Sequence, residues 1–157
     1  YWEKEADKFS DTYSTKKWLL LPNKIFLGKR MAAIAKHIRA ENSNVVLDAG
    51  CGAGEFTNLL ADYYDTVIGV DYSQIMLDRA QQSSKSNTTY YKADCSQIPL
   101  DSDSVDRIFA LGLMDYVDDL DKALGEFVRI IKNNKNIITK NYILISHHFW
   151  YQYAIKY

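Results

Sequence analysis

Short apolar runs alternate with amphipathic stretches along most of the chain. The apolar runs have the length of buried strands, and between them apolar residues recur every three or four positions, as on one face of a helix. Ser73 stands where an N-cap is expected. The predicted strands are 45–47, 66–70, 88–92, 105–111 and, within 137–146, 142–145. The predicted helices are 23–40, 56–63, 73–82 and 120–131, the last with an apolar stripe at Leu120, Ala123, Leu124, Phe127, Val128 and Ile131.

This alternation predicts a three-layer, doubly wound α/β fold with a mostly parallel sheet. Right-handed crossover helices would cover both faces of the sheet. Ligands bind such sheets at the carboxyl ends of the strands, beside the point where the strand order reverses. The 157 residues suffice for a single domain. We expect an N-terminal helical cap at 1–42 and an α/β core at 43–157.

Composition narrows the possible partners. With 47% hydrophobic and 25% charged residues, the chain has the balance of a globular domain. The net charge of −1 provides no basic field to attract nucleic acid or anionic lipid. No apolar run approaches the roughly 18 residues of a membrane span, and Cys51 and Cys95 lack metal or redox spacing. We therefore expect a cytoplasmic protein without a metal, nucleic-acid or membrane partner.

Three alternating glycines follow the first predicted strand in Asp48-Ala-Gly-Cys-Gly-Ala-Gly54, directly before a predicted helix. Glycine permits positive φ and lets a ligand approach the backbone closely. Free N–H groups at the start of a helix can hold an anionic group. A tight turn without any ligand would satisfy the same pattern, so the loop alone leaves both interpretations open.

Acids at the next two strand ends favour a ligand. Asp71 ends the second strand about 20 residues after the first glycine, where it suits ribose hydroxyls. Asp94 ends the third strand, where it can accept a hydrogen bond from an adenine amino group. The last position of the dinucleotide fingerprint holds Glu55 instead of glycine. Asp48 would oppose a pyrophosphate but would suit the ammonium of an amino-acid tail.

Residues 46–54, Val-Leu-Asp-Ala-Gly-Cys-Gly-Ala-Gly, resemble the first motif of the class I, Rossmann-like S-adenosylmethionine-dependent methyltransferases. Three further motifs follow in the order of that family, at 69–73, 93–100 and 109–112, so the resemblance covers 44–131. It implies an enzyme that transfers a methyl group from S-adenosylmethionine to a small molecule and releases S-adenosylhomocysteine. The α/β core would then be the cofactor-binding part of the chain.

The resemblance also implies roles for individual residues. Asp48, Gly50, Gly52 and Gly54 would surround the methionine portion of the cofactor, with Cys51 filling the turn. Asp71 would bind the ribose diol, Tyr72 and Met76 would pack on the adenine, Asp94 would accept from its amino group, and the Cys95 N–H would face a ring nitrogen. Leu111 and Gly112 would pass close to the sulfonium, and Tyr13 resembles an aromatic residue that folds over the donor, or it belongs to the core.

Acceptor contacts are expected after the fourth and fifth strands. Asp115 and Tyr116 follow the fourth strand in the loop that usually lines the acceptor cavity. His147 and His148 follow the fifth strand and are either candidates for a general base or an exposed polar pair. A base is needed only where the acceptor arrives protonated. The Asn-Pro-Pro-Tyr type of motif found in amine-modifying nucleic-acid enzymes is missing, which favours a small-molecule acceptor and slightly favours oxygen as its atom.

Two features depart from the family pattern. Residues 132–136 replace the usual Pro-Gly-Gly turn, and about ten residues after Ser146 cannot supply the two final strands of the family. We expect either an absent C-terminal portion or an abbreviated fold, with an open sheet edge that a partner or a missing segment would cover. The first alternative to a methyltransferase is a protein that binds the cofactor without turnover. The second, which Glu55 at the last fingerprint position disfavours, is a nicotinamide oxidoreductase.

Overall fold

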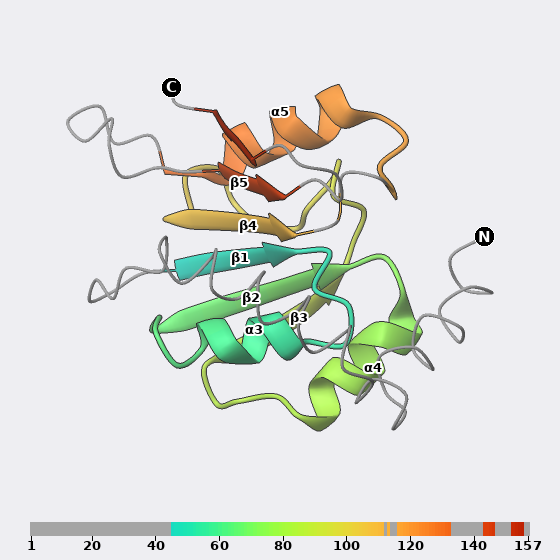
Figure 1. Cartoon of the computed structure of the whole chain (residues 1–157), viewed down its shortest axis with the longest axis vertical. Coiled ribbons are helices and arrows are strands. Elements are labelled where there is room, and N and C mark those ends of the chain that lie inside the picture. The colour runs from blue at the N-terminus through green and yellow to red at the C-terminus, as the bar shows by residue number, and fades with distance from the viewer. Residues whose placement is uncertain (1–44, 112, 114–115, 133–142, 147–151, 156–157) are drawn as a thin grey trace.

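The computed structural model describes residues 45–111, 113, 116–132, 143–146 and 152–155. The described strands form one sheet in the order β3-β2-β1-β4-β5-β6, which Figure 1 shows edge to edge. The predicted cap at 1–42, with its helix at 23–40, lies outside the described residues. The strands are β1 Val45–Ala49, β2 Thr66–Asp71, β3 Thr88–Lys92, β4 Arg107–Leu111, β5 Ile143–Ser146 and β6 Gln152–Ile155.

Three described helices connect or flank these strands: α3 Glu55–Leu60, α4 Gln74–Gln82 and α5 Leu120–Ile130. The predicted cap at Ser73 is confirmed, because the Met76 N–H donates to Ser73 Oγ at 3.4 Å. Asp119 caps α5 in the same way, accepting from the Lys122 N–H at 3.1 Å. Side-chain caps therefore fix where two of the helices begin.

The sheet is parallel from β3 through β5, and β6 runs antiparallel to β5. From β1 the chain builds outward to β2 and β3, then crosses to β4 on the other side of β1. The strand order therefore reverses between β1 and β4. The predicted mostly parallel, doubly wound sheet is confirmed, and this reversal is the place where such sheets bind ligands.

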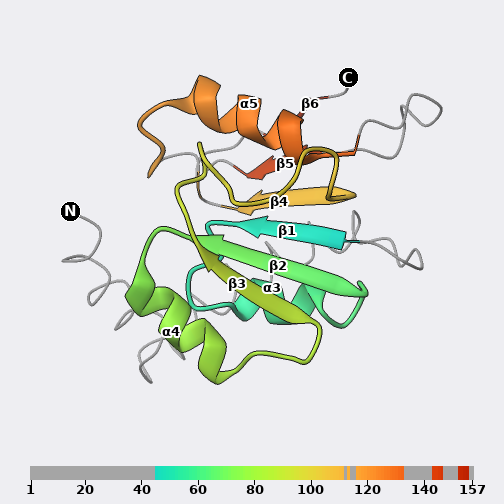
Figure 2. The same ribbon diagram turned by 180° about the vertical axis from the view of Figure 1, so that it is seen from behind.

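Side chains of β1 alternate between two hydrophobic layers. Leu47 and Ala49 pack with Phe127 of α5 on one face. Val46 packs with Leu60 of α3 and with Phe109 on the other face. Seen from opposite sides, Figures 1 and 2 place α3 and α5 on opposite faces of the sheet. The strands between two covered faces are accordingly apolar almost throughout.

The packed face of α5 is narrower than its sequence pattern predicts. Ala123, Phe127 and Ile130 are fully buried, whereas Leu120 and Val128 are 44% and 48% exposed. The prediction that Leu120 and Val128 lie on the packed stripe is therefore wrong. The helix turns the line through Ala123, Phe127 and Ile130 to the sheet, the partly buried Leu124 and Ile131 pack beside it, and Leu120 and Val128 lie on its exposed flanks.

Several element boundaries also differ from the prediction. β4 begins at Arg107, because Val105 forms a separate bridge with Ile131. α3 ends at Leu60, so Tyr63 lies beyond it and is 47% exposed. The fifth strand lies one residue later than 142–145. After it the structure has a single described strand, β6, beside β5.

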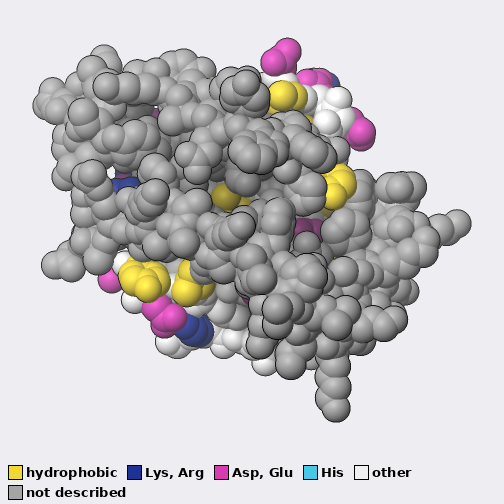
Figure 3. All heavy atoms as spheres, in the orientation of Figure 1, with side chains coloured by type: hydrophobic (Ala, Val, Ile, Leu, Met, Phe, Trp, Pro, Cys, Tyr) yellow, Lys and Arg dark blue, Asp and Glu magenta, His cyan; other side chains and the backbone are white. Residues whose placement is uncertain are grey.

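On the face drawn in Figure 3, the described residues show both apolar and acidic side chains. Figure 3 shows hydrophobic groups in small separate areas with carboxylates beside them, and the visible Lys and Arg side chains do not gather into one basic area. Within the described ranges, no helix has the length and hydropathy needed to cross a membrane. The same residues contain no group of three or more His, Cys, Asp or Glu side chains placed to hold a metal ion.

Candidate functional site

The predicted site residues that the structure describes meet at the carboxyl edge of the sheet. The glycine loop follows β1, Asp71 ends β2, Asp94 follows β3 and Leu111 ends β4. At the reversal of strand order, the loop after β1 touches the loop after β4: a methyl group added at Gly50 would lie 3.0 Å from Leu113 Cδ1. The fold thus brings residues from four strand ends to one edge.

The three glycines of the loop adopt backbone conformations that other residues rarely take. Their φ angles are +73° at Gly50, +54° at Gly52 and +82° at Gly54. Backbone hydrogen bonds hold the loop to β2, because the N–H groups of Gly50 and Cys51 both donate to the Val70 carbonyl, at 2.8 and 3.0 Å. The expectation that these glycines serve positive φ is confirmed.

Gly52 differs from the other two glycines of the loop in the atoms that surround it. Among the described residues, a methyl group at Gly52 would meet no heavy atom within 4 Å, while one at Gly54 would lie 2.7 Å from Tyr90 Oη and 2.9 Å from Ala80 Cβ. Gly54 is therefore needed for packing inside the protein. No described residue covers Gly52, so it is the point of the loop that a ligand can approach closely.

Asp71 ties the loop to the end of β2. Its Oδ2 accepts from the Gly52 N–H and its Oδ1 from the Ser73 N–H, both at 2.8 Å. Burial raises the pKa of Asp71, and these N–H groups act in the opposite direction. A carboxylate offers about four acceptor sites, so one remains on each oxygen for a pair of hydroxyl donors. The sequence pattern does not predict the bond to Gly52.

Asp48 lies beneath the loop and not at its surface. It is 2% exposed, and Thr57 Oγ1 donates to its Oδ2 at 2.6 Å. Its carboxylate faces the start of α3 inside the core. That Asp48 lies beside the methionine portion of the cofactor stays a prediction. Burial raises the pKa of Asp48 from 3.8 to about 7, with Asp71 and Glu55 adding to the effect and Thr57 opposing it.

The raised pKa of Asp48 predicts a pH-dependent stability. Between about pH 4 and 7 the folded chain keeps a proton that the unfolded chain releases, so this group lowers the free energy of unfolding as the pH rises. Replacing Asp48 with Asn removes that loss. Above pH 7 we expect Asp48→Asn to be more stable than the wild type by about 2–4 kcal/mol, with no gain near pH 4.

Urea unfolding across pH 4–8 measures this difference. Asp78→Asn is the matched control, because Asp78 is exposed on α4 and its carboxylate accepts from the Gln74 amide and from no other described residue. The control should follow the wild type at every pH. A constant difference between Asp48→Asn and the wild type from pH 4 to 8 would contradict a titrating Asp48.

Tyr90 supports the loop from below and is absent from the sequence prediction. A methyl group at Gly69 would lie 2.6 Å from Tyr90 Cδ1, and the Gly54 contact involves Tyr90 Oη. Tyr90 therefore fills the space that two glycines leave free. Its Oη is buried and has no hydrogen-bond partner within the described part of the chain. The sequence signal that could have indicated this role of Tyr90 is Gly69, because a glycine inside a strand often marks a site where another group approaches the backbone closely.

The described side chains beyond β2 and β3 form the other part of the edge. Asp94 Oδ1 accepts from both Ser96 N and Ser96 Oγ, at 2.8 and 2.7 Å, and these bonds lower the pKa of Asp94. The ring of Tyr72 is 57% exposed, and Met76 is half-buried. An ionised acceptor and an exposed ring thus stand at neighbouring strand ends.

Of the remaining predicted residues, the structure describes four and leaves five outside the described ranges. Cys51 is buried, and its thiol donates to the Gly52 carbonyl at 3.7 Å, so it fills the turn as expected. Burial raises the pKa of the half-buried Cys95 thiol to about 11. Leu111 is half-buried and Tyr116 is 43% exposed. Tyr13, Gly112, Asp115, His147 and His148 lie outside the described residues.

The sequence profile of a family described as methyltransferase domain matches residues 47–139. The chain belongs to the class I S-adenosylmethionine-dependent methyltransferases. Among curated methyltransferases, it is 39% identical over 88 residues to a malonyl-[acyl-carrier protein] O-methyltransferase of Yersinia pestis, covering 56% of this chain and 33% of that protein. The enzyme of the same name from Pectobacterium atrosepticum is 31% identical over 105 residues, 67% of this chain and 40% of that one. The chain thus spans about a third to two fifths of the length of these relatives.

Solved structures of methyltransferases share the fold. The YcgJ protein of Bacillus subtilis superposes with a TM-score of 0.68 at 24% identity, over 76% of this chain and 51% of that one. Phosphoethanolamine N-methyltransferase 1 of Haemonchus contortus, solved with phosphoethanolamine and S-adenosylhomocysteine, gives a TM-score of 0.74 at 24% identity. That match covers 91% of this chain and 30% of the methyltransferase. These likenesses establish the architecture of the methyltransferase core.

Proposed function

We propose that this methyltransferase chain binds S-adenosylmethionine at the carboxyl edge of its sheet and transfers the methyl group to a small-molecule acceptor, with oxygen as the favoured acceptor atom. Family membership supports the cofactor. The observation that carries the proposal is the open face at Gly52, whose N–H is fixed by Asp71. A ligand above this face would lie beside the carboxylate suited to its ribose.

The described residues fit the shape and charge of that cofactor. In this proposal, Gly50, Gly52 and Gly54 form the backbone surface for the methionine portion, and the buried Asp48 favours a cationic ammonium nearby. Asp71 accepts from the ribose diol through the acceptor sites that its two backbone bonds leave. A pyrophosphate would place negative charge close to the carboxyl group of Asp48. The site therefore favours S-adenosylmethionine over NAD.

The other end of the cofactor is assigned in the same way. Tyr72 and Met76 pack on the adenine, Asp94 accepts from its amino group, and the Cys95 N–H faces a ring nitrogen. Leu111 and Gly112 pass close to the sulfonium, and Tyr13 folds over the donor. The cofactor supplies an activated methyl group on a sulfonium. The work left to the chain is to align donor and acceptor, which can contribute roughly 7–11 kcal/mol when the geometry is ideal.

The names of the curated relatives support an oxygen acceptor. Several are malonyl-[acyl-carrier protein] O-methyltransferases. A malonyl group ends in a carboxylate, which is already ionised near neutral pH, so its oxygen can attack without a general base. Asp115 and Tyr116 are the proposed acceptor contacts, and His147 and His148 are the proposed base for an acceptor that arrives as a hydroxyl. We take a short carboxylic acid held as a thioester as the first acceptor to test.

Calorimetric titration with S-adenosylmethionine, S-adenosylhomocysteine and NAD tests the cofactor. We expect binding of the first two in the micromolar range and none of NAD. A demonstrably folded chain that binds neither adenosyl ligand would contradict the proposal, and a preference for NAD would replace it with an oxidoreductase.

Turnover is tested separately with radiolabelled S-adenosylmethionine and a panel of malonyl thioesters, free dicarboxylic acids, phenols and amines. Label in an ester product supports O-methylation. Label in an amine product would change the acceptor atom. Cofactor binding with no labelled product from any acceptor would support the alternative of a protein that binds without turnover.

A further inference from the structure

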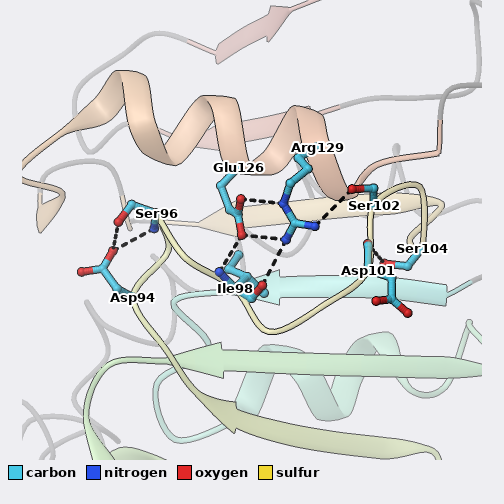
Figure 4. A network of polar contacts seen from close by, with 8 residues as sticks. All are labelled: Asp94, Ser96, Ile98, Asp101, Ser102, Ser104, Glu126 and Arg129. Atoms are coloured by element: carbon cyan, nitrogen blue, oxygen red, sulfur yellow. Dashed lines mark hydrogen bonds and ion pairs between the residues drawn. The ribbon is translucent and has the colours of Figure 1, made fainter.

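A paired acid and base on α5 contact the segment that joins β3 to β4. Glu126 and Arg129 lie one helical turn apart and form two parallel bonds, from Arg129 Nε to Glu126 Oε2 and from Arg129 Nη2 to Glu126 Oε1, both at 2.8 Å. Figure 4 shows the two side chains meeting in this fork. Such bidentate pairs have a fixed geometry as well as charge. Their shape makes them suited to holding a third group in place.

That third group is the backbone of Ile98. The Ile98 N–H donates to Glu126 Oε1 at 2.7 Å, and Arg129 Nη2 donates to the Ile98 carbonyl at 3.1 Å. Arg129 Nη1 also donates to Ser102 Oγ at 3.3 Å, further along the same segment. The side chain of Ile98 is 3% exposed and packs in the core. Ile98 is therefore held by its side chain from within and by both backbone polar groups from α5.

A short turn connects Ile98 to Asp94. The Gln97 N–H donates to the Asp94 carbonyl at 2.9 Å. Ser96 donates twice to Asp94 Oδ1, through its N–H and its hydroxyl. These three bonds fix the turn and the direction of the Asp94 carboxylate relative to it. β3 and the bond from the Ala93 N–H to the Asp71 carbonyl hold one end of this turn, and Ile98 holds the other.

The pair is half-buried, because Arg129 is 37% and Glu126 12% exposed at the side chain. Its charged hydrogen bonds to the backbone of Ile98 stabilise this segment. Arg129 lowers the pKa of Glu126, so the acid stays ionised and keeps accepting from Ile98. The distinctive property of the pair is that it holds both polar groups of one residue, in the segment that carries Asp94.

We propose that Glu126 and Arg129 are positioning residues that set the selectivity of the cofactor site for adenine, by holding the turn that carries Asp94. This inference depends on the proposed function, in which Asp94 accepts from the adenine amino group. A hypoxanthine base carries an oxygen where adenine carries that amino group. A fixed carboxylate repels this oxygen, whereas a carboxylate free to turn away tolerates it. Asp94 is exposed in this structure, so its selectivity depends on the turn that holds its carboxylate in one direction.

The test compares the affinities of S-adenosylhomocysteine and S-inosylhomocysteine by calorimetry in the wild type and in variants. We expect the wild type to prefer the adenosyl ligand by at least about 30-fold. The inosyl ligand loses the hydrogen bond to Asp94 and places its oxygen against the Asp94 carboxylate. Arg129→Leu should reduce that ratio at least about fivefold, and Arg129→Lys, which keeps one donor, should restore part of it. Lys122→Leu is the matched control on the same helix, because within the described part of the chain Lys122 pairs with the exposed Asp119 alone, and its ratio should equal that of the wild type.

Each outcome decides between the two proposals. If Arg129→Leu weakens both ligands equally and keeps the ratio, the pair has only a structural role and this inference fails while the proposed function stands. A wild type that binds both ligands equally also overturns the inference. A folded wild type that binds neither ligand overturns the proposed function and this inference with it. Should Arg129→Leu fail to fold, the ratio of Glu126→Gln, which keeps an acceptor for Ile98 but loses the ionic fork, decides in the same way.

Discussion

Gly54→Ala is expected to destabilise the protein by about 2–5 kcal/mol. Part of the loss is conformational, because φ is +82° at this position and a left-handed conformation costs a residue with a Cβ about 1–2 kcal/mol. The larger part is steric. The added methyl would lie 2.7 Å from Tyr90 Oη and 2.9 Å from Ala80 Cβ, and 3.2 Å from the Ala80 Cα in the backbone of α4. Overpacking of this kind costs about 1–3 kcal/mol.

Gly52→Ala provides the matched control for this effect. Gly52 also has a positive φ, of +54°, but its added methyl meets no heavy atom within 4 Å. Urea unfolding should therefore show a loss of only about 1–2 kcal/mol for Gly52→Ala. Equal losses in the two variants would mean that backbone strain, and not the contact with Tyr90 and Ala80, limits this turn. The same Gly52→Ala protein should remain folded and bind S-adenosylhomocysteine more weakly, since its methyl occupies the open face.

Asp71→Asn is expected to weaken binding of S-adenosylhomocysteine at least about 100-fold. Two hydrogen bonds from the ribose to a charged group contribute about 1.5–3 kcal/mol each, and about 1.4 kcal/mol corresponds to a factor of ten. The amide also presents an NH₂ group toward one of the backbone N–H donors, at Gly52 or at Ser73. The variant therefore loses acceptors for the ligand and disturbs the loop that the ligand approaches. Calorimetric titration measures both the affinity and the number of sites.

Asp78→Asn is the control for Asp71→Asn. Asp78 lies seven residues further along on the exposed side of α4, where its carboxylate bonds to the Gln74 amide. Its replacement changes the net charge by the same amount and should leave the affinity unchanged. If the two variants bind equally well, Asp71 contributes to the loop but not to the ligand, and the proposed ribose contact is wrong.

The fold could be predicted from the sequence because its signals are local. A buried parallel strand is a short apolar run, a cap is a Ser or Asp before a helix, and glycine at alternate positions predicts positive φ. Ser73 and the three loop glycines are confirmed on these grounds. The arrangement of strand ends at one edge follows from parallel pairing, so placing Asp71 and Asp94 at the same edge required no long-range information.

Features that depend on distant contacts could not be predicted. The spacing of Glu126 and Arg129 predicts a pair on a helix surface, but their bonds to Ile98 join residues 28 and 31 positions apart. Asp48 is placed correctly along the strand, yet only the packing of α3 shows that its carboxylate faces inward to Thr57. The alternation of β3 does not say which face Tyr90 takes. In each case, the missing information is which element covers which face.

The central place of β1 in the sheet has a consequence for how the protein is made. One edge of β1 pairs with β2, which follows within about 20 residues, but the other pairs with β4, whose last residue is Leu111. At a synthesis rate of about 5–20 residues per second, about 3–12 s separate the emergence of Ala49 and Leu111 from the ribosome. During that time β1, whose Val46 and Leu47 are buried in the finished core, offers unpaired backbone groups to any neighbouring chain. Yield on expression should therefore depend on how quickly the nascent chain is shielded, more than on the stability of the finished sheet.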